Sequence, residues 1–177
     1  TQRFQRFLDE DVAALEKDLG AAKVGTPWQP HLDEAGRMHP MVWEARREVQ
    51  RRAGALGLYA PHILAELGGG GFSRVEMHHV EEFVYQQSGL GLGLAGLAWT
   101  EGPYPSSEHM SEALRERYLT PLIKGEITLA FANTEFGAGS DVLAMTTHAR
   151  RDGSDWIING RKAWITNAHF ADVVLVS

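Results

Sequence analysis

The residues with the clearest chemical potential lie in two short segments of the C-terminal third. The first, residues 130–141, reads Ala-Phe-Ala-Asn-Thr-Glu-Phe-Gly-Ala-Gly-Ser-Asp. Its glycines, at positions 137 and 139, allow a backbone to approach a ligand closely or to adopt a positive φ angle. Ser140 and Asp141 can cap a short helical turn whose amides would face an anion. A glycine turn with a purely structural role fits the same residues equally well.

The second segment, residues 162–168, reads Lys-Ala-Trp-Ile-Thr-Asn-Ala and closely follows an Asn-Gly dipeptide. Asn-Gly between apolar runs is a strong hairpin signal, so this segment is predicted to begin with a strand. In a strand, Lys162, Trp164 and Thr166 project to one face. A tryptophan beside a hydroxyl is either ordinary core or an aromatic platform with a hydrogen bond beside it, which suits a planar ring system.

Further short strands are predicted around these segments. Residues 127–132 form a short continuous run of strand formers that is typical of a buried strand. Residues 146–151 and 156–158 flank an Asp-Gly turn, and consecutive hairpins would give an antiparallel meander. The last strand, within residues 172–177, is almost wholly apolar, and we expect it to form an exposed sheet edge that promotes self-association.

The N-terminal part is predicted to be helical. Apolar residues recur at three- and four-residue steps from Phe4 to Leu19, which indicates an amphipathic helix closed by Gly20. Residues 23–40 contain three prolines and two glycines, so they are predicted to form a long loop. A second helix is predicted over residues 41–57.

Two more helices follow from local signals. Ser73 and Glu76 match a capping box that predicts a helix running to about Ser88, after a flexible run of four glycines. The last helix is predicted over residues 107–123 and ends in a Lys-Gly pair. The chain of 177 residues is therefore predicted to have an α+β fold. An N-terminal all-α domain would cover residues 1–125, and part of an antiparallel β-barrel or sandwich domain would cover residues 126–177.

Three other patterns each allow two interpretations. Arginines at positions 46, 47, 51 and 52 form either a nucleic-acid patch or a solvated helix face, and the glutamates interleaved with them favour the solvated face. His78 and Glu82 lie one helical turn apart, but no third ligand follows at a useful spacing, so ordinary polar positions are preferred to a metal site. Residues 91–96 satisfy G-x-G-x-x-G, but a dinucleotide fingerprint must follow a strand. Close packing of a buried helix is preferred there.

Composition excludes several classes of function. The chain contains no cysteine, which rules out disulfides, thiolate metal sites and a cysteine nucleophile. A formal net charge of −6 argues against nucleic acid or an anionic membrane as partner. No apolar run is long enough to span a bilayer.

Taken together, these segments resemble the acyl-CoA dehydrogenase family. The family's flavin loop has the core Thr-Glu-Pro-Gly-Ala-Gly-Ser-Asp, and residues 134–141 read Thr-Glu-Phe-Gly-Ala-Gly-Ser-Asp. The family's Asn-Gly hairpin and its Trp-Ile-Thr-Asn-Ala segment match residues 159–160 and 164–168. Residues 117–126 match Arg-Tyr-Leu-x-Pro-Leu-x-x-Gly-Glu, and residues 68–73 match Gly-Gly-Gly-Gly-Phe-Ser. The motifs agree in order and spacing over nearly the whole chain.

The resemblance implies FAD as cofactor and α,β-dehydrogenation of an acyl-CoA thioester. A carboxylate would remove the α-proton while the β-hydride passes to flavin N5. FAD would lie between the helical domain, the middle β-domain and a C-terminal four-helix domain. Trp164 would lie against the flavin ring, Thr166 would bond near N5, and Ser140 would meet the FAD pyrophosphate or the substrate's thioester arm. Residues 89–98 would form part of the acyl pocket floor. The implied cofactor-binding residues are Phe131, Asn133, Thr134, Gly139, Ser140, Trp164 and Thr166.

Two features depart from the family pattern. Phe136 replaces a proline, which frees φ, adds an amide donor and brings bulk near the ligand. The chain ends at Ser177, before the family's catalytic glutamate, so it is expected to be truncated and no catalytic residue is assigned within it. Glu135 is the carboxylate nearest to the motif, but the family pattern places it in the loop.

The resemblance also implies partners and a location. The acceptor would be an electron-transfer flavoprotein or a similar protein, and the full-length protein would be a homo-oligomer. Its place would be the cytoplasm, or the mitochondrial matrix in a eukaryote. Two alternatives stay open: an acyl-CoA oxidase-like or other flavin enzyme on the same scaffold, and a non-catalytic binding module that retains half of the fold.

Overall fold

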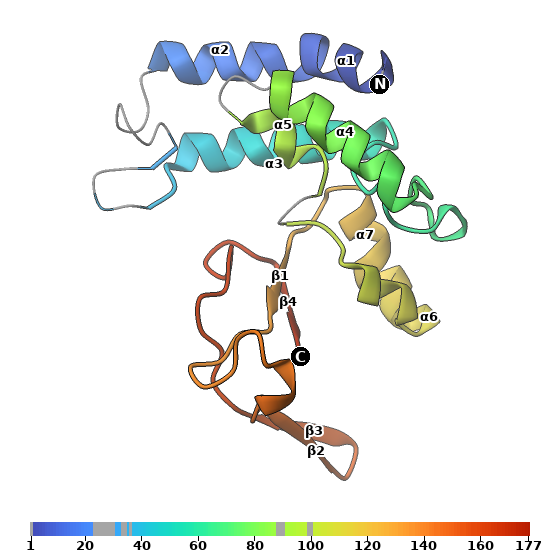
Figure 1. Ribbon diagram of the computed structural model, residues 1–177, viewed down its shortest axis with the longest axis vertical. Helices are drawn as coiled ribbons and strands as arrows, with labels where there is room; N and C mark the ends of the chain where they lie inside the picture. The colour runs from blue at the N-terminus through green and yellow to red at the C-terminus, as the bar shows by residue number, and fades with distance from the viewer. Residues whose placement is uncertain (1, 23–30, 33–34, 36, 88–90, 99–100) are drawn as a thin grey trace. The chain divides into compact units, whose positions relative to one another are not determined.

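The computed structural model describes residues 1–177 except 1, 23–30, 33–34, 36, 88–90 and 99–100. The chain divides into two compact units, which we call the helical unit (Thr1–Ile127) and the strand unit (Thr128–Ser177). Helices make up the first and short strands the second, so the predicted α+β fold is confirmed (Figure 1).

The helical unit begins with one continuous helical segment. It consists of α1 (Gln2–Phe7), a π-helical turn (Leu8–Val12) and α2 (Ala13–Ala22). The predicted end at Gly20 is wrong, because the helix continues for two more residues. A Cβ atom at Gly20 would meet nothing within 4 Å, so no neighbour stops the helix there.

The next helix, α3 (Pro40–Ala55), begins one residue before its predicted start. His39 caps it, since its Nδ1 accepts a hydrogen bond of 3.3 Å from the Met41 amide, and proline occupies the first helical position. Most of the loop predicted over residues 23–40 lies outside the described residues.

The helix α4 (Arg74–Gln87) carries the predicted capping box. The Ser73 amide donates to Glu76 Oε2 over 2.8 Å, and the Glu76 amide donates to Ser73 Oγ over 3.3 Å. The capping prediction is therefore confirmed. Its predicted end near Ser88 lies outside the described residues.

The glycine run before α4 is not a flexible turn, and that prediction is wrong. Gly70 and Gly71 donate amide hydrogen bonds of 3.0 and 2.8 Å to the carbonyls of Ala60 and Ile63. A Cβ atom at Gly69 would lie 2.2 Å from the Ile63 carbonyl oxygen. Glycine is needed at this position because the backbone of the glycine run touches the backbone at Ile63. A 3₁₀ turn, Ala65–Leu67, lies between these two segments.

The short helix α5 (Leu92–Ala95) is buried, as its small residues predict. A Cβ atom at Gly96 would lie 2.6 Å from Cε1 of the buried Phe7 ring. This is the close approach expected from residues 91–96, and it confirms packing as the role of the G-x-G-x-x-G pattern. The core around α5 joins α1 to α4 (Figure 1), and its fully buried members include Val42, Val49, Ala53, Tyr59, Leu92 and Ala95.

The last helical segment begins later than predicted. A 3₁₀ turn (Pro105–His109) precedes α6 (Glu112–Leu114), a π-helical turn (Arg115–Leu119) and α7 (Thr120–Ile123). The helix therefore starts at Glu112 and not at residue 107. Gly125 follows with φ +65°, the expected glycine end.

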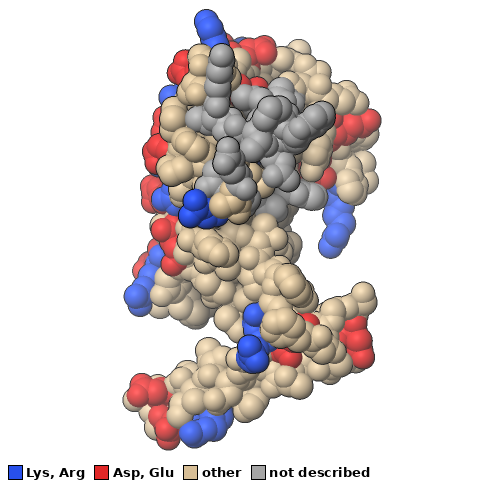
Figure 2. Space-filling view, turned by 90° about the vertical axis from the view of Figure 1, so that its left-hand side faces the viewer, with Lys and Arg blue, Asp and Glu red and all other residues tan. Residues whose placement is uncertain are grey.

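The arginines of α3 are not a uniformly solvated face. Arg46 forms a buried ion pair with Glu101, whose side chain is 1% exposed, and the Arg46 Nε atom lies 3.1 Å from Glu101 Oε1. Arg52 and Arg51 pair with Glu48, and these hydrogen bonds lower the pKa of Glu48. The prediction of a solvated face is thus wrong for Arg46. On the face drawn in Figure 2, acidic and basic side chains are interspersed and form no extended basic patch.

The strand unit contains two small sheets. In one, β1 (Leu129–Ala132) pairs in parallel with β4 (Val173–Val176); in the other, β2 (His148–Asp152) pairs antiparallel with β3 (Asp155–Asn159). The predicted meander is wrong, because residues 162–166 form no strand and β4 returns to β1. Asp172 fixes this return, since its Oδ2 accepts hydrogen bonds of 2.7 and 3.1 Å from the amide and hydroxyl of Thr128.

Two glycines of the helical unit should respond oppositely to alanine. Gly96→Ala should destabilise the fold by about 1–3 kcal/mol, because the buried Phe7 ring must shift. Gly20→Ala should stabilise it by roughly 0.5 kcal/mol, because the helix gains propensity without a clash. Urea denaturation followed by circular dichroism measures both, and equal effects of the two substitutions would contradict this packing.

The buried ion pair should be worth far more than an exposed one. Glu101→Gln leaves the Arg46 guanidinium without its counter-charge and should lower the free energy of unfolding by about 3 kcal/mol. The matched control Glu44→Gln removes a carboxylate that is 72% exposed and pairs with Arg51, and it should change stability by less than about 1 kcal/mol. Urea denaturation of the two variants measures both changes in the free energy of unfolding, and equal losses would contradict the prediction.

Candidate functional site

The two segments singled out in the sequence meet in the strand unit. The Ala163 amide donates a 2.9 Å hydrogen bond to the Thr134 carbonyl, and Lys162 Nζ donates one of 2.9 Å to the Asn133 carbonyl. These bonds join the glycine loop that follows β1 to the segment that carries Trp164. We call the place where the two segments meet the junction. The sequence motifs are thus neighbours in space.

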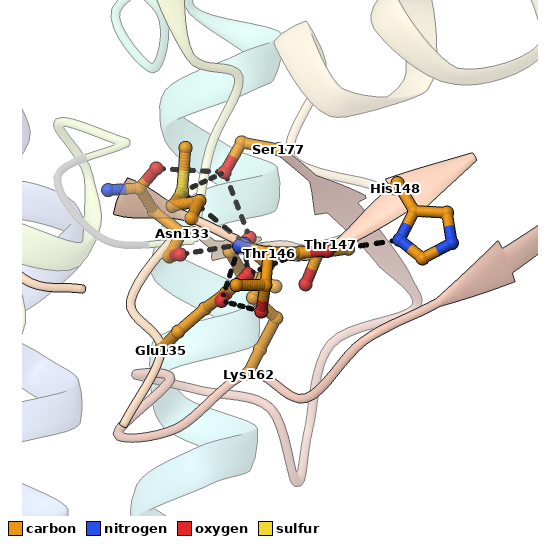
Figure 3. Close-up of polar contacts among 9 residues, drawn as sticks. Asn133, Glu135, Thr146, Thr147, His148, Lys162 and Ser177 are labelled. Atoms are coloured by element: carbon orange, nitrogen blue, oxygen red, sulfur yellow. Dashed lines mark hydrogen bonds and ion pairs between the residues drawn. The ribbon is translucent and has the colours of Figure 1, made fainter. Parts of the chain in front are cut away.

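A buried carboxylate holds this junction together. Glu135, which is 7% exposed, accepts hydrogen bonds from the Thr146 amide and hydroxyl, both 2.8 Å, and from the Thr147 amide, 2.9 Å. Lys162 Nζ lies 3.0 Å from Glu135 Oε1, the oxygen that also accepts from the Thr147 amide, and completes an ion pair. Figure 3 shows these side chains converging from three separate parts of the chain. We call this group the Glu135 cluster.

The Glu135 cluster favours the ionised carboxylate strongly. Hydrogen bonds from Thr147 and Thr146 hold the pKa of Glu135 well below its ordinary value of about 4.5. A carboxylate with a lowered pKa is a weak proton acceptor. Glu135 is therefore suited to holding the loop and unsuited to acting as a catalytic base.

Two further contacts fix the loop. Ser177 Oγ donates a 2.8 Å hydrogen bond to Asn133 Oδ1, which ties the end of β4 to the start of the loop (Figure 3). A Cβ atom at Gly160 would lie 2.1 Å from the Thr147 hydroxyl oxygen. The Asn-Gly dipeptide thus needs its glycine for close approach, although no strand follows it.

On the exposed side of the same junction lie two aromatic rings. Phe136 is 71% exposed and Trp164 is 82% exposed. Their ring centres are 6.2 Å apart, and the rings are inclined at 68° in an edge-to-face arrangement. The Arg161 guanidinium carbon lies 5.6 Å from the centre of the Phe136 ring.

The predicted site residues do not all come together. Asn133 and Thr134 are half-buried beside residues 162–163, and Phe131 is half-buried within β1. Gly139, Ser140 and Thr166 are exposed, and no hydrogen bond recorded for the described residues joins them to the others.

Two predictions about these residues are wrong. Lys162 and Trp164 do not share a sheet face, because the lysine points inward to the carboxylate while the tryptophan is exposed with φ +60°. Asp141 precedes the 3₁₀ turn Val142–Ala144, but its side chain makes no capping hydrogen bond. A turn of three residues is too short to gather amides for an anion.

Sequence reasoning missed the Glu135 cluster. Its members are far apart in sequence, and a single glutamate in a loop is normally exposed. One available signal was the pair Thr146-Thr147, since adjacent threonines between two structural elements offer amide and hydroxyl donors together. Arg161 was missed because nothing local marks an arginine that covers an aromatic ring.

Neither metal ligands nor a membrane helix emerges from the part of the chain that is described. No group of three or more potential ligands is found there, and His78 instead lies 3.4 Å from Glu81. Nor does any described helix combine the length and apolar character needed to cross a membrane.

Comparison with known proteins identifies relatives of both units. Residues 2–126 match the family model of the acyl-CoA dehydrogenase N-terminal domain, and residues 130–177 match that of the middle domain. The 3-(aryl)acrylate reductase of Clostridium sporogenes is 36% identical over 168 residues, covering 94% of this chain and 42% of that protein. Acyl-CoA dehydrogenase FadE12 of Mycobacterium tuberculosis is 34% identical over 167 residues, with the same coverage of 94% and 42%.

A solved structure shows the same fold. The acyl-CoA dehydrogenase of Bacillus anthracis, crystallised in complex with FAD, superposes with a TM-score of 0.66 at 28% identity, covering 99% of this chain and 27% of that one. The chain spans about two fifths of the length of the curated relatives above.

The lowered pKa of Glu135 predicts an acid-sensitive fold. Because this pKa is depressed in the folded protein, its stabilisation is complete above the unfolded value of about 4.5 and is lost as the pH falls below it. Between pH 5 and pH 3, the melting temperature of the wild-type protein should therefore fall more steeply than that of the Glu135→Gln variant. At pH 7 the variant should already melt lower, because Lys162 loses its counter-charge.

Thermal unfolding followed by circular dichroism across this pH range measures the effect. The control is Asp152→Asn, which removes an exposed carboxylate of β2 and should keep the wild-type slope. Parallel curves for wild type and Glu135→Gln would show that the cluster does not stabilise the fold.

Proposed function

Because this chain belongs to the acyl-CoA dehydrogenase family, we propose that it is part of an FAD-dependent enzyme that removes hydrogen from the α and β carbons of an acyl-CoA thioester. The structure of the Bacillus anthracis relative in complex with FAD supports the choice of cofactor. The observation that carries the proposal is the exposed Trp164 ring, held beside the glycine loop by the Glu135 cluster.

The residues on the exposed side of the junction fit a planar, anionic cofactor. A flat aromatic face is available on Trp164, and a cation is available on Arg161. Gly137 and Gly139 leave open space where side chains would otherwise stand, since a Cβ atom at either would meet nothing within 4 Å. A large ligand can therefore reach the loop backbone directly.

Each part of the chain has a proposed task. When bound, FAD supplies the acceptor for a hydride. Trp164 orients the ring by stacking, while the hydroxyls of Thr166 and Ser140 offer hydrogen bonds to cofactor or substrate. The backbones of Asn133 and Thr134 set the position of the loop, and Phe131 contributes to the wall beneath it. These are the assignments that the family motif implies.

The helical unit is proposed to shape the acyl pocket through residues 89–98. Residues 89–90 lie outside the described residues, and most of the segment from 91 to 98 is buried, including Leu92 and Ala95. The pocket would use the surface that the described part leaves exposed. We place the catalytic base outside residues 1–177, because the one buried carboxylate near the loop, Glu135, is a weak proton acceptor. Residues 1–125 would be the N-terminal domain, and residues 126–177 the first part of the middle domain.

The proposal extends to partners and location. The reduced cofactor would pass electrons to an electron-transfer flavoprotein or a similar acceptor, and the enzyme would assemble as a homo-oligomer. It would work in the cytoplasm, or in the mitochondrial matrix of a eukaryote; relatives from eukaryotes include mitochondrial enzymes.

A second candidate is the reverse reaction on the same scaffold. Its support is the 3-(aryl)acrylate reductase of Clostridium sporogenes, at 36% identity. An oxidase would differ again, because its reduced flavin reacts rapidly with oxygen. A non-catalytic binding module would bind ligand without any change in the oxidation state of a flavin.

The visible spectrum of the purified protein tests the proposal. The protein should carry a flavin band that bleaches on anaerobic addition of a saturated acyl-CoA. Recovery of the band on adding an unsaturated acyl substrate to chemically reduced protein, without bleaching by any saturated one, favours the reductase. Bound flavin that no acyl-CoA reduces or reoxidises favours the binding module, and a protein with no affinity for FAD refutes the proposal.

Removal of the Trp164 ring should weaken cofactor binding. Trp164→Ala should raise the dissociation constant for FAD by roughly tenfold, the loss expected for one stacked ring. The matched control is Trp156→Ala, which removes a ring that is 64% exposed on β3, and it should change the constant by less than about twofold. Titration by flavin fluorescence measures both, and similar losses in the two variants would exclude a specific role for Trp164.

A further inference from the structure

Neighbouring residues of the junction lie on opposite sides of it. Glu135 is buried and forms an ion pair with the half-buried Lys162, whereas Phe136 and Arg161, which flank them in sequence, are exposed. These outer residues form the cation–π pair with a 5.6 Å separation. The inner pair thus fixes the backbone that brings the outer pair together.

The outer residues and Trp164 make up a surface that we call the aromatic–arginine surface. Trp164 holds φ +60°, a region that non-glycine residues seldom occupy and that is found preferentially at functional sites. Arg161 forms no ion pair with any carboxylate among the described residues. A strained tryptophan, an exposed phenylalanine and an arginine that no described carboxylate pairs with therefore share one small area.

The chemistry of this surface defines the ligand that it suits. Exposed aromatic faces favour a planar ring, and an arginine favours a phosphate through charge-assisted hydrogen bonds. The open backbone at Gly137 and Gly139 leaves room for such a group beside the rings. A nucleotide offers both groups, because it joins a planar base through a sugar to a phosphate.

We propose that the aromatic–arginine surface binds the phosphate-bearing part of a nucleotide, with Arg161 paired to the phosphate and Phe136 in contact with the adjoining group. The proposal rests on the proposed function, since FAD and acyl-CoA both contain an adenine nucleotide with a pyrophosphate. It adds two residues that the family motif does not assign. One of them, Phe136, stands where the family has proline, so the contact would be particular to this chain.

Binding of four probes to single variants tests the proposal. The probes are FAD, FMN, riboflavin, which has the flavin ring without phosphate, and coenzyme A without an acyl group. The variants are Phe136→Leu and Arg161→Gln, and the controls are Trp156→Leu and Arg150→Gln on the β2–β3 hairpin, which remove an exposed ring and an exposed guanidinium from the same unit. Isothermal calorimetry gives the dissociation constants, and circular dichroism verifies the fold.

The pattern across probes identifies the source of the phosphate. If the cofactor supplies the phosphate, Arg161→Gln should raise the dissociation constants for FAD and FMN by roughly tenfold. The dissociation constant for riboflavin should then change by less than about twofold. If the substrate supplies it, only the constant for coenzyme A should rise. Phe136→Leu should weaken the same probe, and Arg161→Lys should recover part of the affinity because it keeps the charge.

Other patterns overturn the proposal. Unchanged constants in both variants, equal losses in the hairpin controls, or an equal loss for riboflavin in Arg161→Gln would each do so. Should Arg161→Gln fail to fold, Arg161→Lys and Phe136→Leu carry the same comparison. If the wild-type protein binds coenzyme A but no flavin, the proposed cofactor is refuted. The proposal for the aromatic–arginine surface is then tested by the effect of the variants on coenzyme A binding alone. Wild-type protein that binds none of the four probes would refute both.

Discussion

The buried ion pair between Glu135 and Lys162 is the interaction on which the strand unit depends. The unit has two sheets of two strands each and little apolar core; its buried apolar residues are mainly alanines. A carboxylate is costly to bury unless every oxygen is satisfied. Here Thr146, Thr147 and Lys162 supply four donors to it, so that a polar cluster connects segments that side-chain packing alone would hold weakly.

This cluster also determines what the surface offers to a ligand. Glu135 and Lys162 point inward, whereas one sequence neighbour of each, Phe136 and Arg161, is exposed. Trp164 follows Lys162 by two positions and has an exposed ring. The position of the aromatic–arginine surface is therefore a consequence of the ion pair between Glu135 and Lys162. A change to the inner pair is expected to reach the ligand through the backbone, without any contact between the ligand and the altered side chain.

The sequence predicted those features whose causes are local. The Ser73–Glu76 capping box spans three residues, and the small residues of α5 lie within a single turn. Prediction from the sequence failed where the interacting residues are far apart in the chain. Asp172 bonds to Thr128 across 44 positions, beside the parallel pairing of β4 with β1. Arg46 pairs with Glu101 across 55 positions. Alternating hydrophobicity does not encode such partners, so residues 162–166 resembled a strand although Lys162 is held by a carboxylate.

The same reasoning explains how the loop tolerates Phe136 in place of the family's proline. A proline stabilises a loop mainly by restricting φ in the unfolded chain. In this chain the turn is closed instead by reciprocal backbone bonds, with the Glu135 amide 2.9 Å from the Ala138 carbonyl and the Ala138 amide 3.3 Å from the Glu135 carbonyl. The buried carboxylate then anchors the turn at its first residue. With its conformation fixed by these contacts, the second position of the turn is free to carry an exposed aromatic ring.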